Sequence, residues 1–138
     1  MPLAGEQLTY GWALALCYHV GWRGKALREA VALMCAESAR YTEAYHENLD
    51  EDGEVDSTDW GLFQINDKWH PDFEMPAGFN AIYNAEYAHQ MWKDHGKSFK
   101  AWAAYNSGAY KQFSRIVLEH WLLERWRKKI ANVEKRFA

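Results

Sequence analysis

Apolar side chains recur at helical spacing along much of this 138-residue chain. The pattern predicts helices over about residues 6–20, 25–41, 80–95 and 98–105, and one long helix over about residues 110–137. Between residues 48 and 66 the chain becomes acidic and rich in turn formers and then alternates, which predicts a small hairpin or a three-stranded sheet. We therefore predict a mainly helical α+β fold with a small sheet lobe and a long C-terminal helix.

The composition is that of a globular protein, with 49% apolar and 25% charged residues, and this excludes a disordered chain. A chain of this length buries about two-thirds of its unfolded surface on folding. No internal repeat, linker or low-complexity block interrupts the sequence. We expect one domain over residues 1–138, and we expect it to be a monomer.

Charge is divided unevenly along the chain. The first 110 residues hold eight Lys and Arg against sixteen Asp and Glu, whereas the residues from Lys111 onward hold eight against three. The acidic total argues against nucleic acid as a partner. The basic end is either the solvated face of a packed helix or a surface for anionic polymers or membranes. No apolar run is long enough to predict stable membrane insertion.

Glu37 and Asp59 are two carboxyl groups in opposed surroundings. Ala30, Leu33 and Met34 precede Glu37 at helical offsets, so the glutamate shares their apolar face. Desolvation on such a face favours the protonated acid, which is the form that a general acid needs near neutral pH. Asp59 lies in a short polar stretch, where we expect a carboxylate. A pair of this kind is typical of enzymes that cleave glycosidic bonds.

Two sets of motifs resemble known families. Glu37-Ser38, Asp52-Gly53, Ser57-Thr58-Asp59-Trp60-Gly61, Gln64-Ile65-Asn66 and Trp69 resemble the active-site region of animal-type (c-type) lysozymes. His19-Val20-Gly21-Trp22 with Gly24, residues 30–38, residues 61–66 and residues 104–110 resemble the lysozyme-like, transglycosylase-type domains of bacteriophage lysins and tail proteins. Together the matches cover roughly residues 18–110, most of the chain.

The resemblance implies a lysozyme-like fold and a muramidase that cleaves the β-1,4 bond between N-acetylmuramic acid and N-acetylglucosamine in peptidoglycan glycan strands. Glu37 would act as the acid, and Asp59 as a nucleophile or an electrostatic stabiliser, with retention. The resemblance assigns sugar hydrogen bonding to Gln64 and Asn66 and cleft-lining roles to Trp102, Tyr105 and Asn106. For each of these five residues, a role in packing is the alternative to a role in sugar binding. Of the eight tryptophans, we expect about a third to stack on sugars and the rest to fill the core.

Departures from the c-type pattern leave the role of Asp59 open. The chain has two cysteines, so the four-disulfide frame of secreted c-type lysozymes is absent, and the interval from Glu37 to Asp59 is longer. A carboxyl separation of about 5–5.5 Å suits retention and about 6.5–9.5 Å suits inversion. Without a second carboxylate, the sugar's own 6-hydroxyl would attack, as in a lytic transglycosylase. A catalytically silent wall-binding or tail-structural module is the remaining alternative.

The acidic segment 48–59 has a rival interpretation. Its spacing follows an EF-hand calcium loop, with Gly53 sixth and Val55 eighth, but Asp59 stands twelfth and no helix pattern follows. We favour a turn at Asp52-Gly53.

The six histidines show no metal-binding spacing, so we expect no metal and no cofactor.

Cys17 and Cys35 lie on apolar stretches without a CxxC motif, and we expect them to be buried thiols.

The N-terminus shows no basic region followed by an apolar block, so no secretory signal is predicted. We expect synthesis in the cytoplasm and action on the bacterial cell wall, after phage-directed release or as part of a virion.

Overall fold

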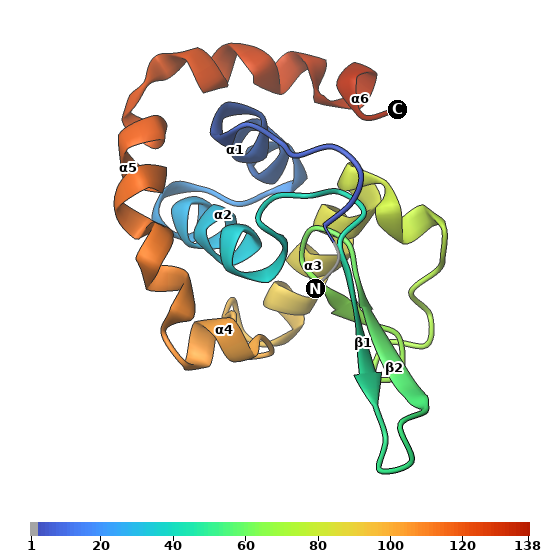
Figure 1. Ribbon diagram of the computed structural model, residues 1–138. Helices are drawn as coiled ribbons and strands as arrows, with labels where there is room; N and C mark the ends of the chain where they lie inside the picture. Colours follow the sequence, from blue (N-terminus) through green and yellow to red (C-terminus); the bar gives the residue numbers. More distant parts are fainter. Residues whose placement is uncertain (1–2) are drawn as a thin grey trace.

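Figure 1 shows the computed structural model, which describes residues 3–138. The helices are gathered into one body, and the hairpin of β1 and β2 projects from it. In chain order the elements are α1 (Tyr10–Val20), α2 (Gly24–Ser38), β1 (Tyr45–Leu49), β2 (Val55–Trp60), β3 (Ile65–Asn66), η1 (Ala77–Phe79), α3 (Ala81–Asp94), α4 (Ala103–Asn106), η2 (Ala109–Phe113), α5 (Ser114–Leu122), η3 (Glu124–Asn132) and α6 (Val133–Arg136). The mainly helical α+β prediction is confirmed. Among the described residues, no helix combines the length and the apolar character needed to cross a membrane.

Local hydrogen bonding sets the boundaries of the first two helices. The Thr9 hydroxyl accepts a backbone N–H of the first turn, so α1 begins later than predicted. α2 ends at Ser38 because Ala39 and Arg40 adopt left-handed backbone conformations, with φ of 51° and 68°. The helix is therefore shorter than predicted, and Glu37 is its penultimate residue.

The three strands form one antiparallel sheet in the order β1-β2-β3, as the sequence predicted for this region. In its register Asp59 lies opposite His46 on β1 and opposite Asn66 on β3, and Ser57 lies opposite Asn48. Because side chains alternate along a strand, Ser57 and Asp59 share one face of β2. The sheet thus gathers polar side chains from all three strands around Asp59.

A buried asparagine on α3, Asn84, ties the sheet lobe to the helices. Its Oδ1 accepts the Phe63 N–H at 2.9 Å, and its Nδ2 donates to the carbonyls of Trp60 and Gly78, both at 3.0 Å. Gly61 lies against this amide with φ of +74°, and a Cβ there would collide with Asn84. Glycine is required at position 61 for both reasons.

The helical core is apolar and rich in rings. Trp22 is fully buried, with its ring centroid 5.4 Å from that of Phe63 and 5.8 Å from that of Phe99. Cys17 and Cys35 are buried free thiols in the same core, which confirms the prediction. Most of the large aromatic content therefore serves packing.

The C-terminal region differs from the prediction. The expected long helix over residues 110–137 is wrong: the chain forms η2, α5, η3 and α6 instead, with an extended backbone at Leu123 (φ −77°, ψ 123°) between α5 and η3. The bend carries the last segments across α1 (Figure 1), where Trp126, Val133 and Phe137 are buried. Tertiary packing therefore overrides helix propensity in a stretch without proline or glycine. The short helix predicted over residues 98–105 is limited to α4.

Candidate active site

Glu37 lines a cavity of about 320 Å³ formed by the end of α2, the sheet and the segment that leads into α4. Its side chain is half-buried. Burial raises the pKa of Glu37 from the ordinary 4.5 to about 7, and the negative charge of Asp59 adds to the shift. The apolar helix face predicted this direction. Near neutral pH a large fraction of Glu37 therefore carries a proton that it can donate.

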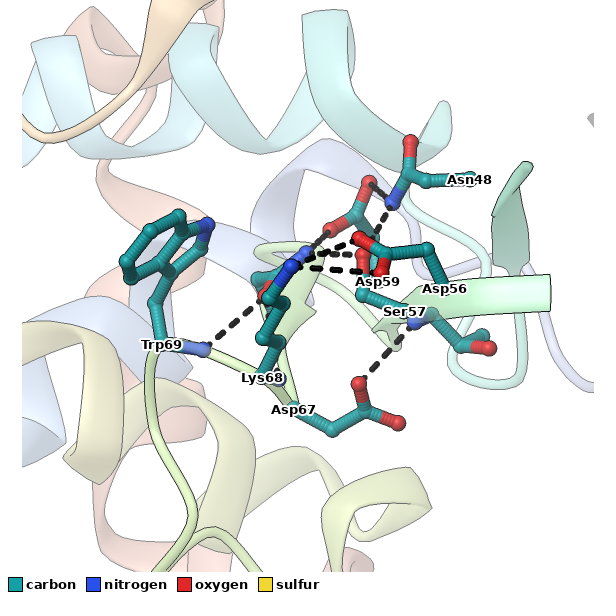
Figure 2. A network of polar contacts seen from close by, with 9 residues as sticks. Asn48, Asp56, Ser57, Asp59, Asp67, Lys68 and Trp69 are labelled. Carbon is teal, nitrogen blue, oxygen red and sulfur yellow. Dashed lines mark hydrogen bonds and ion pairs between the residues drawn. The ribbon is translucent and has the colours of Figure 1, made fainter. Parts of the chain in front are cut away.

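Asp59, on β2, lines the same cavity. Both of its oxygens accept hydrogen bonds from side-chain amides: Oδ2 from Asn48 Nδ2 at 3.2 Å and Oδ1 from Asn66 Nδ2 at 2.8 Å. Figure 2 shows this network around Asp59. Amide donors on both oxygens suit a carboxylate, which can only accept. The structure thus brings the two predicted catalytic residues together in contrasting surroundings.

The side-chain amide of Asn66 makes all of its hydrogen bonds to other groups of the protein. Nδ2 also donates to Ser57 Oγ at 3.0 Å, and Oδ1 accepts the backbone N–H groups of Lys68 and Trp69 at 3.0 and 3.1 Å. An amide has two donors and two acceptor lone pairs, so all four are occupied. These contacts favour a positioning role toward Asp59 over the sugar contact that we predicted for Asn66.

Asn48 and Ser57 belong to the site but were not predicted from the sequence. Asn48 Nδ2 donates to Ser57 Oγ at 3.1 Å as well as to Asp59, so one small network joins β1, β2 and β3. The two-residue spacing of Ser57 and Asp59 was a usable signal, because it places both on one strand face. The partner on β1 could be found only once the register was known.

Gln64 and Trp102 line the cavity, and each is also tied to the backbone. Gln64 Nε2 donates to the carbonyls of Ala44 at 3.0 Å and Gly61 at 2.8 Å. Within the described part of the chain, its Oε1 is the atom left to face a ligand. Trp102 is 4% exposed, and its Nε1 donates to the Phe63 carbonyl at 2.9 Å. Trp102 therefore lines the cavity and also belongs to the hydrophobic core.

Tyr105 and Asn106 are not among the residues that line this cavity. Tyr105 stacks on Tyr110, with ring centroids 4.8 Å apart, and lines a separate hollow beside the first turns of α2. Asn106 is exposed, and its Nδ2 donates to the Lys100 carbonyl at 2.8 Å. α4 contacts both α2 and η2, and the lining of the Glu37 cavity ends at Ala103, the first residue of α4. The structure does not bring these two predicted residues to the others.

Trp69 and His70 border the cavity. The sequence placed Trp69 in the motif that resembles an active-site region but gave it no role, and it did not single out His70 for the site. The Trp69 side chain is 74% exposed, whereas Trp22, Trp102 and Trp126 are buried. An indole left in water at a cavity edge offers a flat apolar surface for a ligand. The composition predicted that some tryptophans would be exposed in this way, but it could not say which.

The acidic segment forms the turn of the β1–β2 hairpin. Asp50 Oδ1 accepts the backbone N–H groups of Asp52 at 2.9 Å and Glu54 at 3.0 Å, and Gly53 has a φ of +80°. Strands flank the turn where an EF-hand has helices. Among the described side chains, no group of three or more His, Cys, Asp or Glu is arranged to hold a metal ion.

One comparison with known proteins identifies a family. A family model described as a lysozyme-like domain matches residues 14–104, which include Glu37, Asp59 and the cavity residues as far as Ala103. A search of curated proteins and a search of solved structures each found no match. Since the family match covers well over half of the sequence, the chain belongs to the lysozyme-like domain family.

Proposed function

We propose that this domain is a muramidase that hydrolyses the β-1,4 bond between N-acetylmuramic acid and N-acetylglucosamine in peptidoglycan. The observation that carries the proposal is the pair of carboxyl groups in one cavity. Burial keeps Glu37 partly protonated near pH 7, and two amides hold Asp59. Family membership points to the same substrate class, the glycan strands of peptidoglycan.

Glu37 acts first as the general acid. It transfers its proton to the bridging oxygen as the glycosidic bond breaks, so the leaving sugar departs as a neutral alcohol. The carboxylate that remains then takes a proton from the attacking water, which completes hydrolysis and restores the acid. The apolar surroundings that raise its pKa suit both steps, because they bring the two protonation states close in energy near neutral pH.

Asp59 acts on the anomeric carbon. Its carboxylate either bonds to this carbon in a glycosyl intermediate or stabilises the positive charge that develops there, and we favour retention. The amides of Asn48 and Asn66 hold the carboxylate in place before the charge develops, so little reorganisation is needed. This support for Asp59 is the reason to favour hydrolysis over attack by the sugar's own 6-hydroxyl.

Trp69 is proposed to stack on a sugar ring at the edge of the cavity. Trp69→Ala is expected to raise KM for glycan strands about three- to tenfold with little change in kcat, because it removes a stacking surface used equally before and during the reaction. The exposed position predicts a change in unfolding free energy of no more than about 0.5 kcal/mol. Trp69→Phe should retain most of the binding. An unchanged KM in the alanine variant would argue against this role.

The rate of peptidoglycan cleavage is expected to fall as the pH rises through about 7, because only protonated Glu37 can donate. Above that pH the rate should drop about tenfold per pH unit. Initial rates on purified peptidoglycan at constant ionic strength test this, with circular dichroism at each pH to verify folding. A rate that stays level well into the alkaline range would exclude Glu37 as the acid.

A further inference from the structure

A second hollow, of about 520 Å³, is lined by residues at the beginning of α1, by Arg40 and by residues of the C-terminal segment. The side chains that define its character are Tyr10, Arg40, His120, Arg125, Trp126 and Lys129. It shares no lining residue with the Glu37 cavity. Apart from Arg40, its lining residues lie outside the region matched by the family model, so family membership does not account for this hollow.

The hollow is lined by positive charge. Arg40, Arg125, Lys129 and His120 line it, and the described side chains of its lining include no Asp or Glu. None of these four residues takes part in an ion pair found among the described side chains. Uncompensated charges of one sign in a concave surface raise the local concentration of the opposite ion.

Arg40 is held rigidly at this site. Its Nε donates to the Leu8 carbonyl at 2.9 Å, one terminal nitrogen donates to Cys35 Sγ at 3.4 Å, and its guanidinium carbon lies 3.9 Å from the centre of the Tyr10 ring. Tyr10 in turn stacks on His120, with ring centroids 4.7 Å apart. Among the described residues, these two hydrogen bonds use two of the five guanidinium N–H groups. A fixed, planar set of donors matches the oxygens of a phosphate group.

We propose that this hollow binds a phosphate-ester anion. Arg40 would supply the preorganised donors, and Arg125 and Lys129 the further charge. Leu123 and Trp126 give the hollow an apolar part that suits the organic portion of an ester. The basic excess from Lys111 onward, which the sequence left open between a solvated face and an anion-binding surface, is thereby assigned in part to a defined site.

The test uses the full chain and two phosphate sources. Calorimetric titration with glycerol phosphate, with glycerol as the neutral control, is one arm. Sedimentation with phosphatidylglycerol–phosphatidylcholine vesicles, against phosphatidylcholine alone, is the other. Arg125→Gln/Lys129→Gln is expected to weaken binding at least about tenfold. The matched control is Arg115→Gln/Lys128→Gln, which removes the same charge from exposed positions outside the hollow and should change binding less than about twofold.

Saturable binding that distinguishes the two double variants supports the proposal, and the arm in which it occurs shows whether the phosphate is a soluble ester or a lipid headgroup. Arg125→Gln alone, at an exposed position, repeats the comparison with Arg115→Gln if the double variant unfolds. If a hollow variant and its matched control weaken binding equally, the binding reflects diffuse electrostatic attraction, and the proposed site is overturned. Absence of saturable binding in both arms would overturn it as well.

Discussion

Glu37→Gln is expected to lower the rate of peptidoglycan cleavage by about 10²–10⁴-fold. The amide has nearly the shape of the protonated acid, so the cavity keeps its form, but it cannot give a proton to the bridging oxygen. Release of reducing ends from purified peptidoglycan measures the loss. Glu86→Gln, which makes the same change at an exposed position on α3, is the control and should leave the rate unchanged. Wild-type activity in the Glu37 variant would end the assignment of this residue as the acid.

The same variant should also change how stability depends on pH. The pKa of Glu37 is raised from 4.5 to about 7 in the folded protein, so folding takes up a proton between these values. Since the folded state holds more protons there, the wild-type unfolding free energy falls as the pH rises through this window. Glu37→Gln lacks this loss and should be the more stable protein above pH 7. Chemical denaturation of both proteins at about pH 4 and about pH 8 tests the sign of this difference in unfolding free energy.

Asp59→Asn is expected to lower the cleavage rate at least about a hundredfold, because it removes the negative charge that we propose acts on the anomeric carbon. The variant should also lose about 1–3 kcal/mol of stability. One atom of the new amide would be a donor facing Asn48 or Asn66, both of which already donate to this side chain. Asn66 cannot simply reverse its amide, because its Oδ1 accepts two backbone N–H groups.

Asp56→Asn is the matched control for that experiment. Asp56 lies on the same strand, but its carboxylate pairs with Lys68 at 2.9 Å at the surface, so its loss should cost little activity. Thermal unfolding of both variants separates loss of folding from loss of catalysis. If Asp59→Asn cleaves glycan strands as fast as the wild type, Asp59 has no catalytic role and the reaction depends on the glutamate alone.

The sequence was sufficient to predict those features of the fold and the site that depend on local periodicity. Glu37 could be predicted as a partly desolvated acid because helix phase alone places it with Ala30, Leu33 and Met34, and burial is the main cause of its raised pKa. The hairpin could be predicted from alternation and turn residues. The end of α2 was misplaced because left-handed alanine and arginine leave no pattern in the sequence.

What could not be predicted depends on tertiary contacts. Asn48 joins Asp59 only through the register of β1 on β2, and Asn66 looked like a ligand contact because nothing local shows its bonds to the turn that follows. The bend at Leu123 has no proline or glycine to mark it, and it follows from the burial of side chains on α1. The basic hollow exists because of that bend, so it could not be predicted either.

We propose above all that Glu37 and Asp59 hydrolyse the bond on the reducing side of N-acetylmuramic acid. Mass spectrometry of the soluble fragments that the wild-type chain releases from purified peptidoglycan tests it most directly. We predict fragments that end in a reducing N-acetylmuramic acid. Fragments lighter by one water, with an anhydro-muramic end, would contradict hydrolysis, and an absence of released fragments would contradict glycan cleavage itself.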